Sequence, residues 1–156
     1  MILGLSVFGF VHTVLCFVAL GCGLVVIAGL LAGQRLNGLT AAYFVSAVAA
    51  DGTGLALPRD FDFVHQLGLV MAAALLIAIL ARYVFRLAGG WRATYAVATV
   101  VSVHILVFFT IGEAFLRLPF LIRMSPNLTE TPFVLVQLAA IVLFAALAVG
   151  AVRRFK

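Results

Sequence analysis

Apolar residues fill five long stretches of the chain, and short polar or turn-forming segments separate them. The stretches cover roughly residues 4–33, 39–57, 63–86, 93–118 and 132–152. A helix needs about 20 mainly apolar residues to cross the hydrocarbon core of a bilayer, and each stretch reaches or approaches that length. The pattern therefore predicts an all-α protein, a polytopic transmembrane helical bundle of five spans that forms one domain over residues 1–156.

The second stretch, residues 39–57, is the least apolar of the five. It contains Asp51, Thr53 and two glycines. If it failed to cross, four spans would remain, and Arg82 and Arg86 would face the side opposite to the carboxyl terminus. We expect five spans, and whether residues 39–57 cross completely is left open by the sequence.

Local signals mark the ends of several stretches. Pro119 follows the fourth, where a missing backbone donor matters little. Thr131 and Pro132 open the fifth, as an N-cap residue followed by proline at the first helical position. The first stretch is longer than the apolar core of a signal peptide, and no Lys or Arg precedes it, so we expect a span and not a cleaved signal.

Composition supports lipid as the surrounding solvent. Hydrophobic residues make up 66% of the chain and charged residues 10%, and a soluble domain of this size could not bury so much apolar surface. The net charge of +5 comes from cations that stand singly or in pairs between apolar stretches. This spacing is typical of topology signals and of contact with anionic headgroups, and it disfavours nucleic-acid binding.

The distribution of cations predicts the orientation. With the amino terminus outside, seven cations face the cytoplasm: Arg35, Arg82, Arg86, Arg92, Arg153, Arg154 and Lys156. Three face outward: Arg59, Arg117 and Arg123. Because cytoplasmic segments carry the excess of Lys and Arg, we expect an N-out, C-in protein, with its acidic residues Asp51, Asp60, Asp62, Glu113 and Glu130 all in the outer half.

Ionisable side chains inside the predicted spans are the candidate functional residues, because such groups usually face a bundle interior, a cavity or a partner. At about 1.5 Å of rise per residue, His65 lies ~4 Å below the outer boundary, Glu113 ~7 Å, Asp51 ~9 Å and His12 ~13 Å. His104 lies ~21 Å deep, near the midplane. Four of the five thus share a shallow outer zone.

Asp51 is the most informative of them, because no cation stands three or four residues away on its own helix. One interpretation is a proton- or ion-handling carboxylate at the base of an outward pocket, paired with His12 or His65 or protonated. The other is that residues 51–54 form an unwound helix end that is open to water. The sequence does not decide between them.

The other polar residues have more conventional interpretations. Glu113 precedes Arg117 by four residues, which favours an ion pair on one helix face. His104 is either a haem or quinone contact or a hydrogen-bonded packing histidine, and the packing role is favoured. A bis-histidine haem would need His12 and His104 at one depth, yet they differ by ~8 Å. Gln137 is a candidate interhelical hydrogen bond or pocket wall.

Small residues recur at helical spacing on the first two predicted spans. The second carries Ala42, Ser46, Ala50 and Gly54, and the first carries Gly29 and Gly33. Such stripes let helices approach closely in lipid. We expect them to serve packing within the bundle, with homodimerisation as the alternative.

Two segments resemble a family of small bacterial multi-pass membrane proteins of unknown function. FDFVHQLGLVMAAALLIAILAR matches its helix start, with Phe61 and His65 in a Phe-x-x-x-His pattern. EAFLRLPFLIRMSPNLTETPFVLVQ is similar to its outer loop and final helix, through Thr129, Pro132, Phe133 and Gln137. The resemblance covers roughly residues 20–150, although this chain lacks the histidine that related domains carry before the second span. It implies a bacterial inner-membrane helical bundle and supplies no activity.

Two functional hypotheses follow. The first is an outward-facing polar pocket for a small ligand, proton or redox cofactor, lined by Asp51, His65 and His12 with Gln137 as an accessory. The second is a structural or accessory subunit, or an assembly factor, of a larger membrane complex. No catalytic triad, phosphate loop or metal-protease motif occurs in the sequence, which disfavours an enzyme, and we assign no metal site.

Overall fold

The computed structural model describes residues 7–56 and 63–155 of the chain. Its elements are helices: α1 Val7–Leu31, α2 Asn37–Leu55, α3 Phe63–Ile79, the π-helical turn η1 Leu80–Val84, α4 Trp91–Arg117, α5 Pro119–Met124 and α6 Thr131–Arg154. The described part contains no strand, so it is all-helical as the sequence predicts. Predictions that concern residues 1–6, 57–62 and 156, among them those for Asp60, Phe61 and Asp62, lie outside the described residues.

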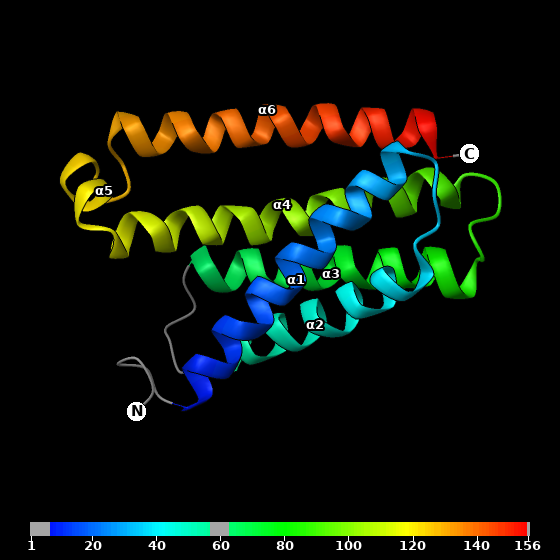
Figure 1. Cartoon of the computed structure of the whole chain (residues 1–156), viewed down its shortest axis with the longest axis horizontal. Helices are drawn as coiled ribbons and strands as arrows, with labels where there is room; N and C mark the ends of the chain where they lie inside the picture. The colour runs from blue at the N-terminus through cyan, green and yellow to red at the C-terminus, as the bar shows by residue number, and fades with distance from the viewer. Residues whose placement is uncertain (1–6, 57–62, 156) are drawn as a thin grey trace.

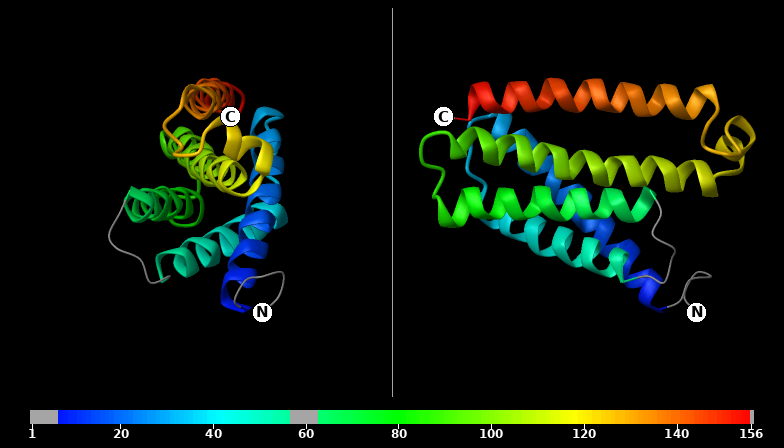
Figure 2. Two further views of the ribbon diagram at one scale, coloured as in Figure 1. Left: turned by 90° about the vertical axis from the view of Figure 1, so that its left-hand side faces the viewer. Right: turned by 180° about the vertical axis from the view of Figure 1, so that it is seen from behind.

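The five long helices run alternately up and down and form a bundle (Figure 1). Helices α3, α4 and α6 lie nearly alongside one another, and α1 crosses them obliquely with α2 packed against it. Figure 2 shows the same arrangement end-on and from behind. As a result, α1 and α3 begin at the same end of the bundle, and α2 returns the chain between them.

At the end of the bundle opposite to the starts of α1 and α3, the turns contain described arginines that the sequence assigns to the cytoplasmic side. The α1–α2 turn contains Arg35, η1 and the following turn contain Arg82 and Arg86, and α6 ends at Arg153 and Arg154. Gly33 closes α1 with a φ of 70°, and Gln34 N donates to Gly29 O at 2.8 Å, a left-handed helix end that glycine adopts readily.

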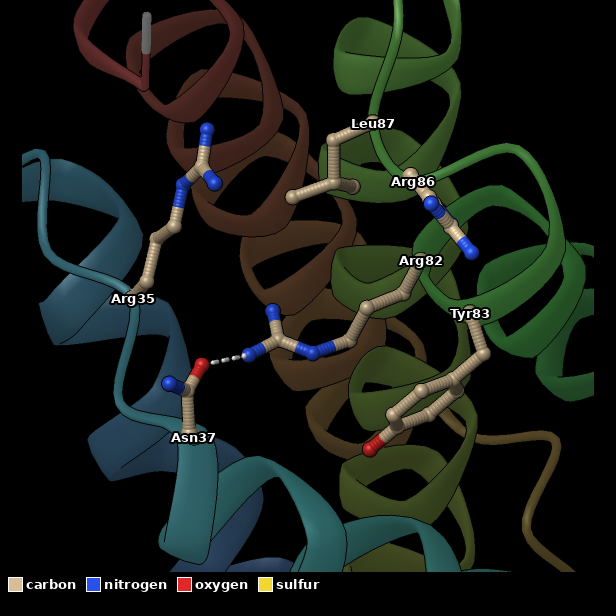
Figure 3. Close-up of a pocket in the computed structure, with 6 residues that line it drawn as sticks. All are labelled: Arg35, Asn37, Arg82, Tyr83, Arg86 and Leu87. Carbon is tan, nitrogen blue, oxygen red and sulfur yellow. Dashed lines mark hydrogen bonds between the residues drawn. The ribbon is translucent and has the colours of Figure 1, made fainter.

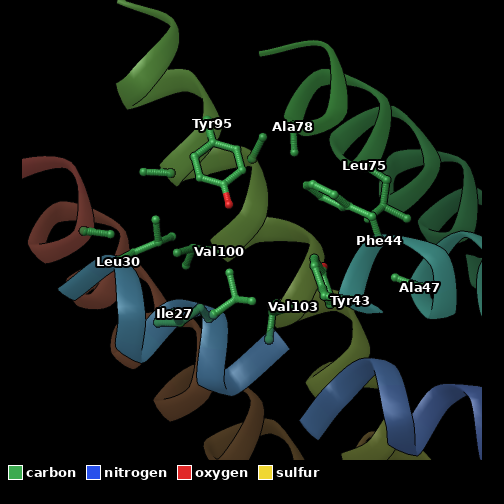
Figure 4. Packing of buried hydrophobic residues seen from close by; sticks show 14 of the residues in the cluster. Ile27, Leu30, Tyr43, Phe44, Ala47, Leu75, Ala78, Tyr95, Val100 and Val103 are labelled. Carbon is green, nitrogen blue, oxygen red and sulfur yellow. The ribbon is translucent and has the colours of Figure 1, made fainter. Parts of the chain in front are cut away.

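The core lies where α1, α2, α3 and α4 meet (Figure 4). Tyr43 and Tyr95 are fully buried, and Tyr43 packs against Gly23 of α1. A Cβ atom at Gly23 would lie 2.7 Å from Val103 Cγ2 and 2.9 Å from Tyr43 Cε2. The absence of a side chain at this position therefore lets α1 approach α2 and α4 closely.

The outward faces of the bundle are apolar. Side chains such as Val142, Leu143 and Leu76 are 55–69% exposed, which suits contact with lipid tails and not with water. Four helical segments are long and apolar enough to cross a membrane: Val7–Leu31, Phe63–Val84, Trp91–Arg117 and Thr131–Arg154. The chain thus has the character of a helical membrane protein. Helix α2 is not among the four, so the count of five spans stays a prediction.

The predicted boundaries agree with the helices to within a few residues, and two local features were not predicted. Helix α5 interrupts the segment after α4, because Leu118 is extended (φ −87°, ψ 118°) and Pro119 then starts a new helix. The third predicted span ends in a π-helical turn in which Phe85 N donates to Leu80 O at 2.9 Å. Glu130, and not Thr131, occupies the N-cap position of α6, a one-residue difference.

Candidate functional site

A polar contact joins α1 to the last turns of α2. His12 Nδ1 and Thr53 Oγ1 are 3.0 Å apart. The Thr53 hydroxyl also donates to the backbone, at 2.8 Å from Ala49 O and 2.9 Å from Ala50 O. A hydroxyl has one hydrogen and two acceptor lone pairs. With its hydrogen directed to its own helix, Thr53 accepts the bond, so Nδ1 of His12 carries the hydrogen.

The other ring nitrogen of His12 faces its own helix. Cys16 Sγ lies 3.6 Å from Nε2, and a thiol is a weak donor that can reach the Nε2 lone pair. Gly54 allows the ring to lie against α2, since a Cβ there would be 3.2 Å from His12 Cε1. The His12 ring is therefore held between α1 and α2 by contacts at both of its nitrogens.

Asp51 lies on the same part of α2, two residues before Thr53. Its side chain is half-buried, and no hydrogen bond or ion pair joins it to another described residue. Helix α2 continues without a break through Leu55, so residues 51–54 are not the unwound end that one interpretation of the sequence required. The carboxyl group is presented from a regular helix.

Helix α3 approaches this carboxyl group through Gly68. A Cβ at Gly68 would lie 3.6 Å from Asp51 Oδ1 and 2.9 Å from Leu55 Cδ2. His65 is half-buried one turn earlier on α3, and residues three apart share a helix face. His12 and Thr53 are thus in contact between α1 and α2, whereas Asp51, two residues away on α2, faces Gly68 of α3, with His65 one turn earlier on that helix. We call Asp51, His12 and Thr53 the outer polar cluster.

His104 and Gln137 lie apart from this cluster, at the contact between α4 and α6. The His104 ring packs on Phe144 with centroids 5.1 Å apart, and Gln137 Nε2 donates to Phe108 O at 3.2 Å. His104 Nδ1 and Gln137 Oε1 are buried and have no hydrogen-bond partner in the described structure. The five candidate ligand residues therefore divide between two places.

A shallow apolar hollow of about 180 Å³ adjoins His104. Small-molecule pockets usually enclose roughly 300–1,000 Å³, so the hollow is small for a haem or a quinone ring system. His12 faces α2 while His104 faces α6, and the two imidazoles do not form a facing pair. Among the described residues, no group of three or more His, Cys, Asp or Glu could hold a metal ion.

Glu113 and Arg117 form an exposed ion pair near the end of α4, as their spacing predicts. Arg117 Nε donates to Glu113 Oε2 at 2.6 Å, and both side chains are more than half exposed. This pair satisfies the Glu113 carboxylate locally, so Glu113 is a part of the helix surface and not of the outer polar cluster.

The small-residue stripe on α2 is used inside the chain. Ser46 and Ala50 are buried, and Gly54 meets His12 as described above. Gly29 on α1 is covered by the α1–α2 turn, since a Cβ there would lie 2.6 Å from Leu36 Cδ1. These small residues thus serve packing between helices of the chain, and homodimerisation stays a prediction.

Two polar features were not anticipated from the sequence. One is the loop before α6, where the Glu130 carboxylate accepts hydrogen bonds from Ser125, Asn127 and the backbone of Thr129. The other is a cleft at the arginine-rich end of the bundle, lined in part by Arg35, Arg82 and Arg86. The signal for the cleft was present as the four-residue spacing of Arg82 and Arg86, two residues that we used only to predict the orientation.

Comparison of the chain with protein-family models, with curated proteins and with solved structures finds no match. The resemblance of residues 20–150 to a family of bacterial membrane proteins therefore stays a prediction. Any functional conclusion must come from the geometry of the chain itself.

Proposed function

We propose that the chain is a five-span protein of the bacterial inner membrane, N-out and C-in, with a proton-binding site in its outer half. The crossing of α2 is supported by the course of the chain. Helices α1 and α3 are both apolar enough to span and run in the same direction, so the segment that joins them must return across the bilayer. That segment contains α2, whose 19 residues extend over ~28 Å, close to the ~30 Å of a hydrocarbon core.

The orientation is supported by the separation of charge along the bundle. Arg35, Arg82, Arg86, Arg92, Arg153 and Arg154 occupy one end, and Asp51, Glu113 and Glu130 lie toward the other. The positive-inside rule places the arginine-rich end in the cytoplasm. The outer polar cluster then lies in the outer leaflet, a short distance below the headgroups.

Asp51 is the proton-binding group, and its placement is the single observation that carries the proposal. It is a half-buried carboxyl on an unbroken helix, it has no described ion-pair partner, and it stands two residues from the Thr53 hydroxyl that accepts from His12. An ionisable residue within a membrane-spanning helix is by default a candidate site of proton or ion transfer.

The reaction that the outer polar cluster permits is the gain or loss of a proton. Gain of a proton by Asp51 removes one negative charge from the place where α1, α2 and α3 meet. While Asp51 is ionised, its negative charge favours a second hydrogen on the His12 ring of the same cluster, and gain of a proton by Asp51 removes this effect. Protonation at the outer face is thereby coupled to the contact between α1 and α2.

Infrared spectroscopy of the full chain in liposomes tests the assignment, because a protonated carboxyl has a carbonyl stretch that the carboxylate lacks. We expect one carboxyl band that titrates with pH, disappears in Asp51→Asn and persists in Glu113→Gln. The Glu113 variant is the matched control, since it removes an acid from the exposed ion pair on α4. A titrating band that survives in Asp51→Asn would show that Asp51 does not bind the proton.

A further inference from the structure

A cleft of about 240 Å³ opens at the arginine-rich end of the bundle, between the α1–α2 turn and the end of η1 (Figure 3). Its lining residues are Arg35, Asn37, Arg82, Tyr83, Arg86 and Leu87. A water molecule takes up about 30 Å³ in the liquid, so the cleft has room for a phosphate group together with several waters. Three guanidinium groups border this one small space.

Arg82 crosses the cleft in a fixed position. Its Nη2 donates to Asn37 Oδ1 at 2.6 Å and its Nη1 donates to Tyr95 Oη at 3.1 Å. The guanidinium carbon lies 5.2 Å from the Tyr95 ring centroid and 5.9 Å from that of Tyr83. These partners are neutral, so they orient the guanidinium without cancelling its charge.

Arg86 is also held on a rigid support. Arg86 and Leu87 have positive φ angles of 50° and 58°, a strained conformation for side-chain-bearing residues. The turn is fixed because Leu87 is only 4% exposed and inserts into the core. In addition, Leu87 N donates to Ala81 O at 2.9 Å, and Arg92 Nε donates to Leu87 O at 3.2 Å. Arg86 is therefore presented from an ordered turn that follows a π-helical segment, a feature common at functional sites.

No carboxylate among residues 7–56 and 63–155 balances the cleft. None of Arg35, Arg82 and Arg86 forms an ion pair with a described residue, and the acids of the described chain lie toward the other end of the bundle. Arginine is suited to phosphate because its planar guanidinium donates two parallel hydrogen bonds to one oxyanion. The cleft thus combines a concentrated positive charge with fixed donors, and its described lining contributes no anion.

The position of the cleft matches the depth of lipid headgroups. Tyr83 lines it, and the Trp91 ring stacks on Phe85, the residue before Arg86, with centroids 3.8 Å apart. Exposed aromatic rings of this kind collect at the membrane–water interface. Basic pockets between spanning helices at this depth are typical sites for anionic headgroups.

We propose that the cleft bordered by Arg35, Arg82 and Arg86 binds a phosphate group, carried by an anionic phospholipid such as phosphatidylglycerol or free in solution. The phosphate oxygens accept from the guanidinium groups, and Asn37 holds Arg82 in place. This site is independent of the outer polar cluster and of which end of the bundle faces the cytoplasm.

Trp91 provides the measurement, because it is the single tryptophan of the chain and its ring stacks on Phe85, the residue before Arg86 of the cleft. The full chain, freed of lipid in detergent, is titrated with phosphatidylglycerol or phosphatidylcholine that carries brominated acyl chains, and quenching of Trp91 reports binding. We expect phosphatidylglycerol to bind about tenfold more tightly, since each arginine near an anionic surface contributes roughly a several-fold preference.

Two double variants separate the cleft from the general charge of this end. Arg35→Gln with Arg86→Gln removes two charges from the cleft, and Arg153→Gln with Arg154→Gln removes two charges from the end of α6. Both pairs are exposed, and unchanged thermal unfolding establishes that each variant is folded. We expect the first to lower the preference to about twofold or less and the second to keep most of it.

Inorganic phosphate distinguishes the two sources of the group, with chloride at equal ionic strength as the control for screening. If phosphate displaces the lipid more than chloride does, and the Arg35 and Arg86 double variant loses this difference, the cleft binds phosphate from solution. Lipid preference without such displacement assigns it to the headgroup. The proposal is overturned if neither ligand depends on Arg35 and Arg86, or if both double variants lose the preference equally.

Discussion

The Tyr43 hydroxyl on α2 and the Ser102 hydroxyl on α4 lie 2.6 Å apart at a site closed to solvent. Ser102 also donates to Thr99 O at 3.0 Å, so Tyr43 is the donor and Ser102 the acceptor. This bond is the central polar link between α2 and the rest of the bundle.

The direction of this bond predicts an asymmetry between two substitutions. Tyr43→Phe removes the donor and should cost about 0.5–1.5 kcal/mol of stability, because Ser102 keeps its bond to Thr99. Ser102→Ala leaves the Tyr43 hydroxyl buried without an acceptor and should cost about 1–3 kcal/mol. Unfolding by SDS in mixed micelles measures both. A larger loss in Tyr43→Phe would mean that the bond runs in the opposite direction.

Gly23 is expected to be intolerant of any side chain. Gly23→Ala places a Cβ within 3 Å of Val103 and Tyr43, and overpacking of this kind costs about 1–3 kcal/mol. Gly21 is the matched control on the same helix, since a Cβ there meets nothing within 4 Å. Gly21→Ala should be neutral or stabilising by up to about 1 kcal/mol. Equal midpoints of SDS unfolding for the two variants would contradict this packing.

The loop before α6 should lose stability in acid. Hydrogen bonds from Ser125, Asn127 and the Thr129 backbone lower the pKa of Glu130 from 4.5 to about 2. A lowered pKa stabilises the folded state fully above about pH 4.5, and this contribution disappears as the pH falls toward 2. The difference in thermal stability between the wild type and Glu130→Gln should therefore be constant near neutral pH and shrink below about pH 4.5. A difference that stays unchanged down to pH 2.5 would contradict the depressed pKa.

The hydrogen-bond geometry also predicts the tautomer of His12. With Thr53 as acceptor, the hydrogen of the neutral ring resides on Nδ1, and ¹⁵N NMR of labelled histidine should show this tautomer in the full chain. Thr53→Val keeps the shape of the side chain but removes the acceptor, and it should shift the population toward the Nε2 form. Thr53→Ser, which restores the hydroxyl, should return the wild-type spectrum.

Sequence reasoning anticipated the helices well, because long apolar stretches and strong breakers determine them locally. The end of α1 at Gly33 and the break at Pro119 follow from backbone chemistry that a single residue imposes. The ion pair of Glu113 and Arg117 could also be predicted from the sequence, since four-residue spacing places both residues on one helix face. These features depend on neighbours in sequence.

The sites were harder to predict, because they depend on which helices meet. Depth along the membrane grouped Asp51 with His12, and this gave no indication that His12 would contact Thr53 or that Gln137 would face Phe108 of α4. The arginine cleft requires the left-handed turn at Arg86 and Leu87, which neither residue favours by itself. The turn forms because burial of Leu87 in the core offsets the backbone strain, and no sequence pattern predicts this effect.

The His12–Thr53 contact has a consequence for biogenesis. Helix α2 carries Asp51, Thr53 and two glycines near its end, and its insertion alone would bring these groups into lipid unmatched. Helix α1 supplies the imidazole that meets Thr53, so the two helices suit entry into the membrane as a preformed hairpin. Under the five-span topology, a substitution of His12 would then impair the insertion of α2 during translation, before the mature protein is formed.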